Sequence, residues 1–286
     1  MLRIVLGALS VPAFVLAAAC GPQGAPHAQR AILREHIPRV KEILRQDRLR
    51  HREGVIEAAR RLRRGFLVED HARREREMRR VLQQLQEPPR GIGAFITSPM
   101  SFLAAVDADG IVIARDSDDD QMKGQNFAER YEVVRAALEG RVSRGLGEFE
   151  ALQEGAPPSY SILFAAPARH EGRVVGAVVA GIPLWRESQR LSRQLRVELA
   201  PEIERGLIVW VYLYKGDRVF PSPEAPPEVT EVLPDAAARA AGLARSPGGF
   251  TGQMQLYTKW YGYGVVPMPA IAEDVGVIVV RADPAD

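Results

Sequence analysis

The sequence predicts an α+β protein in which one long amino-terminal helix precedes two antiparallel-sheet lobes. Apolar residues recur at helical spacing up to about residue 86, and short β-type runs begin at residue 92. A hairpin, a helix and two further strands then follow one another, and the same order returns after residue 206. With 286 residues, 46% of them apolar, the chain is long enough to bury a core of this size.

Residues 1–20 have the pattern of an export signal. Arg3 precedes the uncharged apolar run 4–16, which is shorter than the roughly 20 residues that a spanning helix needs. Three alanines then lead to Cys20, the only cysteine. This segment resembles the lipobox of bacterial lipoproteins, which implies lipidation of Cys20, although Ala17 stands where that motif usually has leucine. Gly21 after the cysteine implies sorting to the outer membrane.

Ordinary signal cleavage after the alanines is the alternative, and it would leave a soluble periplasmic protein. Under either interpretation, no later apolar run is long enough to be expected to cross a membrane.

Residues 21–90 are expected to form a tether and a long basic helix. The tether is Gly21–Ala28, and the helix runs from about Ile37 to Gln86 and is ended by a proline pair. Gly54 is its expected weak point, at a cost of about 1 kcal/mol relative to alanine. The many arginines of this helix are interpreted as a solvated face with Glu–Arg pairs, and contact with anionic lipid headgroups stays open. The net charge of +2 gives no reason to expect nucleic-acid binding.

Residues 91–185 form the first predicted lobe. Two apolar runs flank the turn Asp107–Gly110 and predict a β-hairpin. A helix is expected over Phe127–Glu139, and two antiparallel strands over Tyr160–Arg169 and Val174–Leu184.

A linker helix over 186–205 and a second, smaller lobe over 206–286 complete the predicted order. In that lobe the turn Lys215–Asp217 is expected to connect the two strands of a hairpin. A proline-rich loop and a short alanine-rich helix follow the hairpin. Strands are then expected over 250–257, 260–266 and 275–281.

Three segments of the first lobe resemble Cache domains, which are extracytoplasmic relatives of PAS domains. They are the hairpin Val106–Arg115, the helix Arg130–Gly140, and the strand pair from Phe164 through Gly172–Val178 to Leu184. The resemblance covers about residues 95–185, and the repeated order of elements is similar to the double-Cache arrangement. It implies a site for a small carboxylate or amino acid between the sheet and the helices.

The resemblance also assigns candidate ligand-binding residues to the helix and to the facing strand: Arg130, Tyr131, Arg135, Tyr160, Ser161 and Phe164. Guanidinium and phenol groups suit a carboxylate because they form charge-assisted hydrogen bonds. Successive strand residues point to opposite faces, so the three strand residues cannot all face one pocket. The alternative for both arginines is a solvent-facing position paired with Glu129, Glu132 or Glu139.

No catalytic, metal or cofactor site is expected. The chain has no Gly-x-Ser-x-Gly, phosphate-loop or His-Glu-x-x-His motif. The acidic run Asp116–Asp120 superficially resembles a calcium loop, but Gln121 stands where such a loop requires glycine and Phe127 where it requires glutamate. A solvated loop is the better interpretation.

The expected function is therefore a lipid-anchored extracytoplasmic protein that binds and senses a small molecule. Cache receptors carry a transmembrane helix and an output region that this sequence lacks, so a separate signalling protein or a homodimer is the expected partner. The alternative is a structural or interaction lipoprotein that has lost its ligand and that dimerises or docks through the long helix.

Overall fold

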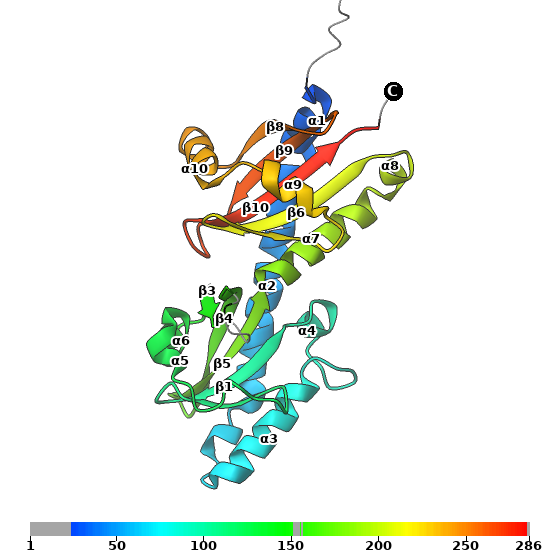
Figure 1. The fold of residues 1–286 in the computed structure, drawn as a ribbon. Helices are drawn as coiled ribbons and strands as arrows, with labels where there is room; N and C mark the ends of the chain where they lie inside the picture. The colour runs from blue at the N-terminus through cyan, green and yellow to red at the C-terminus, as the bar shows by residue number, and fades with distance from the viewer. Residues whose placement is uncertain (1–23, 151–154, 156, 285–286) are drawn as a thin grey trace, which may run out of the picture.

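The computed structural model describes residues 24–150, 155 and 157–284 of the chain. The predicted signal peptide and Cys20 lie outside the described residues. Two five-stranded antiparallel sheets are arranged one after the other along a long helix, as the ribbon shows (Figure 1). The predicted fold class is confirmed.

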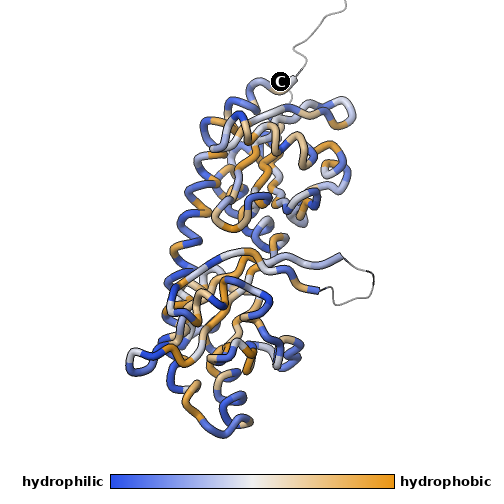
Figure 2. The backbone as a smooth tube through the Cα atoms, turned by 90° about the vertical axis from the view of Figure 1, so that its left-hand side faces the viewer, coloured by the Kyte–Doolittle hydropathy of each residue, from blue (hydrophilic) through white to orange (hydrophobic). Residues whose placement is uncertain are grey.

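The long helix consists of α1 (Pro26–Ala31), a π-helical turn (Ile32–His36) and α2 (Ile37–Leu62). At 1.5 Å per residue it is roughly 55 Å long. It forms a column along one side of both lobes (Figure 2). Its buried residues recur every three or four positions and include Val40, Ile43, Val55 and Leu62. This stripe faces both sheets, and each large apolar side chain in it contributes about 1.5–3 kcal/mol through burial.

The helix is shorter at one end, and longer at the other, than its periodicity predicts. It ends at Leu62, and a 3₁₀ turn (Gly65–Leu67) precedes a separate helix, α3 (His71–Gln84). The Asp70 carboxylate caps α3 by accepting from the backbone N of Arg73 at 2.8 Å. At the other end, α1 begins at Pro26, inside the segment expected to be a tether. The prediction of one helix to Gln86 was therefore wrong.

Gly54 lies inside α2 for a packing reason. A Cβ at this position would lie 2.5 Å from Cε1 of Phe95, a fully buried residue of α4 (Gly93–Thr97). The helix interior thus accepts the low helix propensity of glycine because α4 approaches its backbone there.

The first sheet has the strand order β2-β1-β5-β4-β3. Its strands are β1 (Phe102–Asp107), β2 (Val112–Arg115), β3 (Ser143–Phe149), β4 (Ser159–His170) and β5 (Arg173–Pro183). Both predicted strand pairs are present, whereas β3 was expected to be loop. The predicted helix after the hairpin is two short helices, α5 (Phe127–Arg130) and α6 (Glu132–Leu138), because Tyr131 is extended between them.

The second sheet repeats this topology in the order β7-β6-β10-β9-β8. Its strands are β6 (Ile208–Lys215), β7 (Arg218–Pro221), β8 (Phe250–Leu256), β9 (Lys259–Pro267) and β10 (Val275–Ala282), with α9 (Pro227–Val232) and α10 (Ala236–Arg245) after β7. The linker is α7 (Leu184–Glu198) followed by α8 (Ala200–Glu204). The second lobe therefore matches the first in strand order as well as in the sequence of elements.

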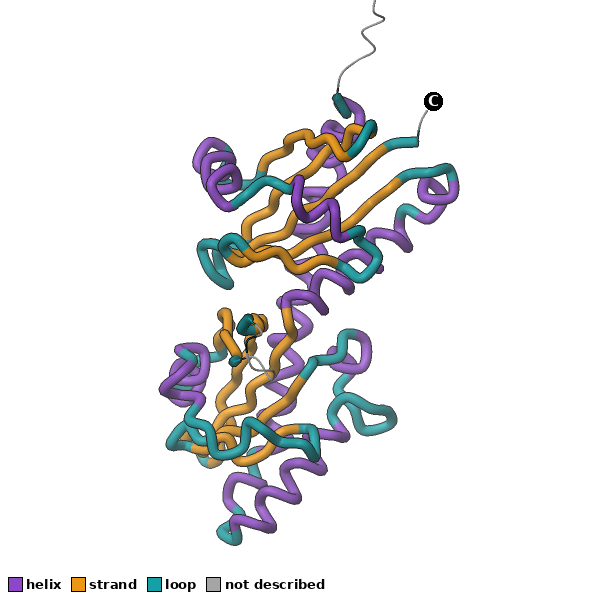
Figure 3. Tube along the Cα trace, in the orientation of Figure 1, coloured by secondary structure: helices purple, strands orange, loops and turns teal. Residues whose placement is uncertain are grey.

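Helices cover both faces of each sheet (Figure 3). One apolar cluster runs along α2 and takes in the near faces of both sheets, from Leu103 and Ile162 in the first to Val211 and Val266 in the second. A second cluster lies on the far face of the first sheet, under α5 and α6, and a third lies on the far face of the second sheet. Across the described part of the chain, no helix is both long and apolar enough to cross a bilayer.

Candidate ligand-binding site

A cavity of about 630 Å³ opens on the far face of the first sheet, the face turned away from α2. It lies where the ends of β1, β2, β3, β4 and β5 meet the loop before α5. Its walls are Ser101, Phe102, Arg115, Ser117, Asp119, Gln121, Met122, Gln125, Arg130, Phe149, Glu150, Ser159, Ser161 and Pro183. This mixture of aromatic, aliphatic and hydrogen-bonding side chains is typical of small-molecule sites.

Arg130 lines the cavity from α5. Its guanidinium donates to Oε1 of Gln125 at 3.1 Å and lies 3.3 Å from Oε1 of Glu150. The Glu150 side chain is 89% exposed, so this ion pair is screened by water and holds Arg130 only weakly. Arg130 is thus a cation at the cavity that an incoming carboxylate can recruit.

Arg115 lines the cavity from the end of β2. Its guanidinium carbon lies 6.0 Å from the centre of the Phe102 ring, and its Nε lies 3.6 Å from Oδ1 of Asp116. That Nε is buried and has no hydrogen-bond partner among the described residues. The Arg115 side chain as a whole is 20% exposed, so the guanidinium stays partly accessible to an acceptor in the cavity.

Of the three strand residues proposed from the sequence, only Ser161 lines this cavity. It is buried near the start of β4, next to the end of β5. Phe164 lies on the opposite face of the sheet, 5.1 Å from the His51 ring of α2. Tyr160 also lies on that face and contacts Phe220 of the second lobe. The alternation of strand residues separates them from Ser161, as expected.

Tyr131 and Arg135 support the wall of the cavity and do not line it. The buried Tyr131 packs between Phe127 and Phe149 and donates from its hydroxyl to the carbonyl of Glu148 at 3.0 Å. Burial raises the pKa of its phenol. Arg135 donates to the carbonyl of Ala128 at 2.8 Å and so satisfies the carboxyl end of α5.

The acidic run before α5 is tied to α3. Asp120 lies 3.3 Å from the guanidinium of Arg79 and accepts from the backbone N of Arg115 at 2.9 Å. Asp118 accepts a hydrogen bond from Gln83 of α3, and Asp116 accepts one from Gln86, which lies just after α3. Within the described residues no cluster of metal-ligating side chains was found. These aspartates thus fix one wall of the cavity.

Several lining residues were not found by reasoning from the sequence, among them Arg115, Gln125 and Phe149. For Arg115 a local signal existed, because it is the one charged residue at the end of the apolar run 111–114. For the other two, no local pattern distinguishes them from ordinary loop and strand residues.

Comparison with solved structures identifies the same two-lobe fold in sensor proteins. The sensor domain of the V. cholerae histidine kinase DctB superposes with a TM-score of 0.53 at 14% identity, covering 90% of this chain and 99% of that one. The periplasmic domain of Vibrio cholerae LuxQ superposes with a TM-score of 0.50 at 11% identity, covering 86% of this chain and 98% of that one. An extracellular ligand-binding receptor from Desulfohalobium retbaense gives 0.51 at 14% identity, covering 85% of this chain but only 39% of the receptor.

At such low identities the likeness establishes the fold, and it agrees with the expected Cache-like architecture. No family model matches the sequence, and no curated protein matches it either.

Proposed function

We propose that the chain is an extracytoplasmic sensor that binds a small carboxylate or amino acid in the cavity of its first lobe and is held at the cell envelope by lipid on Cys20. The observation that carries this proposal is the cavity on the far face of the first sheet, with Arg115 and Arg130 among its lining residues. The similar solved structures, which are sensor and receptor domains, support it.

The chemistry of the cavity suits a ligand of this class. When a ligand binds, Arg130 gives up its water-screened ion pair with Glu150 and pairs with the ligand carboxylate instead. The new ion pair is stronger because the ligand carboxylate is less exposed to water than Glu150. Arg115 offers a second guanidinium, and Ser101, Ser159 and Ser161 offer hydroxyl groups. Asp119 or Glu150 can accept from an ammonium group, so an amino acid fits as well as a simple acid.

The proposed anchor agrees with the placement of the two lobes. Both ends of the described chain lie at the second lobe, while the first lobe and α3 lie at the far end of the molecule (Figure 1). Lipid on Cys20, four residues before Gly24, would hold the second lobe near the membrane and present the first lobe away from it. A separate signalling protein is the proposed recipient of the signal.

A thermal-shift screen of the chain against amino acids and small organic acids tests the proposal. A ligand at 100 times its dissociation constant adds about 2.7 kcal/mol of stability. We expect Arg115→Gln and Arg130→Gln each to lower the affinity for the best ligand at least tenfold, because each removes a charge-assisted hydrogen bond worth about 1.5–3 kcal/mol. Arg141→Gln, which changes an exposed arginine of the same lobe outside the cavity, should leave the affinity unchanged. If no acid shifts the melting temperature, or if all three variants bind alike, the proposal fails.

Cell fractionation tests the anchor separately. We expect the chain in the membrane fraction and the Cys20→Ser variant outside it. Equal distribution of both would refute lipid attachment at Cys20 without affecting the ligand site.

A second candidate function, dimerisation through the long helix, has one observation in its favour. Leu49 and Ile56 of α2 are 40% and 37% exposed. They are seven residues apart, which places them on the same face of the helix about two turns apart. Sedimentation of Leu49→Glu/Ile56→Glu tests it, with Val197→Glu, a change at an exposed position of α7, as control. A dimer lost only in the first variant supports this role, and a monomeric parent chain excludes it.

A further inference from the structure

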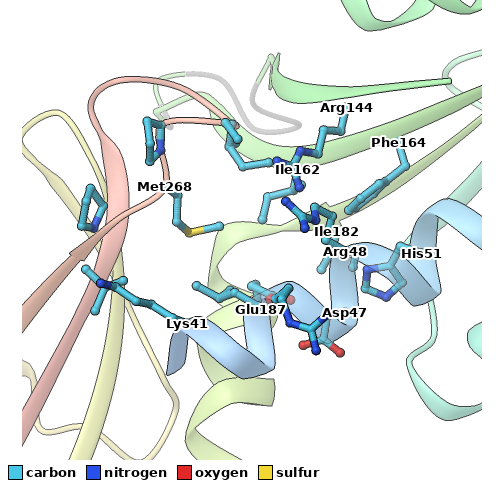
Figure 4. A pocket seen from close by; sticks show the side chains of 17 residues that line it. Lys41, Asp47, Arg48, His51, Arg144, Ile162, Phe164, Ile182, Glu187 and Met268 are labelled. Atoms are coloured by element: carbon cyan, nitrogen blue, oxygen red, sulfur yellow. The ribbon is translucent and has the colours of Figure 1, made fainter. Parts of the chain in front are cut away.

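A second cavity, of about 210 Å³, lies between the two lobes and beside α2. Its walls come from α2, from β3, β4 and β5 of the first lobe, from Glu187 of α7, and from the segment 266–271 at the end of β9 (Figure 4). The volume is far larger than the roughly 10–15 Å³ that one water molecule requires. Clefts between domains are a preferred place for small-molecule sites.

Two guanidiniums converge on this cavity without a carboxylate to neutralise them. Arg48 from α2 and Arg144 from β3 point toward one another across it (Figure 4). Neither forms a salt bridge or a side-chain hydrogen bond with any residue that the structure describes. Partial burial, and next the nearby charge of Arg48, lower the pKa of Arg144. Two like charges held together in this way are unfavourable unless an anion joins them.

Among the other charged groups at the cavity, Asp47, Glu187 and Arg45 already have partners. The carboxylates of Asp47 and Glu187 lie 2.5 Å and 2.6 Å from the guanidinium of Arg190, and their side chains are only 5% and 4% exposed. Arg45 is paired with Glu42 at 2.7 Å. The described residues thus leave Arg48, Arg144 and Lys41 as cations that a ligand can engage from within the cavity, and of these Arg48 and Arg144 point toward one another.

The rest of the wall is mainly apolar. Phe164, Ile162 and Ile182 of the first lobe face Met268 of the second, close to the two guanidiniums (Figure 4). Ile271 of the second lobe also lines the cavity. An inorganic anion would leave these surfaces in contact with water, whereas an apolar chain attached to the anion would cover them.

We propose that the cavity between the lobes is a second binding site, for a small organic carboxylate with an apolar chain. The carboxylate lies between Arg48 and Arg144, and the chain lies against Phe164, Ile182 and Met268. This site is distinct from the cavity on the far face of the first sheet and goes beyond the function proposed above. Because both lobes supply its walls, its ligand contacts both.

Calorimetric titration with 4-methylpentanoate tests the proposal. The full chain carrying Arg115→Gln and Arg130→Gln is the parent, because those changes remove the two guanidiniums of the first-lobe cavity. We expect a dissociation constant below about 1 mM, and at least tenfold weaker binding when Arg48→Gln or Arg144→Gln is added, because each removes a charged hydrogen-bond donor. Arg52→Gln, an exposed arginine one turn further along α2, is the matched control and should leave binding unchanged.

Two further probes define the ligand class. The neutral 4-methylpentanamide should bind at least tenfold more weakly than the acid, and inorganic phosphate should compete only weakly. The melting temperatures of Arg48→Gln and Arg144→Gln should be no lower than that of the parent, since each change relieves a repulsion.

Each other outcome overturns the proposal. No binding of the acid at millimolar concentration excludes the site. Binding that Arg48→Gln and Arg144→Gln leave unchanged places the ligand elsewhere. Equal affinity for phosphate reduces the site to an adventitious anion site. None of these results bears on the first-lobe cavity, whose test uses the chain with Arg115 and Arg130 intact.

Discussion

Replacing Arg190 with methionine should destabilise the chain by about 3–5 kcal/mol, which is the usual cost of removing one partner from a buried ion pair. Arg190 of α7 lies between Asp47 of α2 and Glu187 of its own helix. Its removal leaves two negative charges that are almost fully buried and no cation between them. The stripe of buried residues on α2 contains Asp47 at the level where the helix passes from one lobe to the other.

Neutralising the carboxylates should recover most of that loss. In Asp47→Asn/Arg190→Met/Glu187→Gln no buried charge remains in this group, and replacement of a complete buried ion cluster is often close to neutral. The triple variant is therefore expected to be more stable than Arg190→Met alone, and a mutant cycle reports the coupling as a non-additive energy.

Urea unfolding followed by tryptophan fluorescence measures these energies. Arg193→Met is the matched control, because Arg193 lies on the same helix, is exposed, and has no charged partner among the described residues. Its effect should stay within about 0.5 kcal/mol. If Arg190→Met costs no more than this control, or if the triple variant is less stable than Arg190→Met, the ion cluster does not hold α7 to α2.

Three further changes test the fold. Gly54→Ala should lower the unfolding free energy by about 1–3 kcal/mol in urea titrations, because its Cβ would lie 2.5 Å from the Phe95 ring, and equal or greater stability would contradict the close approach of α4. Burial, and next the charge of Arg281, lower the pKa of His36 to about 4 from an unfolded value of 6.5. Between pH 6.5 and 4 the unfolded state therefore binds a proton that the folded state does not bind. The free energy of unfolding has its full value above pH 6.5 and falls by up to about 3 kcal/mol as the pH is lowered through this window. His36→Gln should flatten the pH dependence of urea stability there, and an unchanged slope would show that His36 is not buried in its neutral form. Asp70→Ala should cost about 1 kcal/mol by removing the cap of α3, measured by the same titration, and no loss would show that the cap is not formed.

Local signals in the sequence predict most of the strands. The turn Asp107–Gly110 holds its hairpin because Oδ1 of Asp107 accepts from the backbone N of Asp109 and Ile111 and because Gly110 has a positive φ. Such contacts lie within a few residues and can be read from the chain. Strand β3 was missed because Gly145 and Gly147 weaken its strand pattern, and it forms through pairing with β4.

The end of the long helix was misjudged for a different reason. Apolar spacing continues from α2 into α3, so periodicity alone joins them. Gly65 and the capping residue Asp70 were the signals of the break, and they are weak beside a sustained pattern.

The candidate site could be predicted only where a family resemblance supplied the positions. Arg130 comes from a segment that resembles Cache domains, and Ser161 lies on the strand that leads into another such segment; both line the first-lobe cavity. Arg115, from the far end of a hairpin strand, and the pair Arg48 and Arg144, far apart in sequence, meet their cavities only through tertiary packing. No spacing rule within one element could have found that convergence.

A crystal structure of the chain with the acid or amino acid that raises its melting temperature most tests the central claim most directly. The account predicts that the ligand lies in the cavity on the far face of the first sheet, with its carboxylate within 3.2 Å or so of the guanidinium of Arg115 or Arg130. A ligand bound only elsewhere on the molecule, or a first-lobe cavity filled by protein side chains while the ligand is bound, would contradict it.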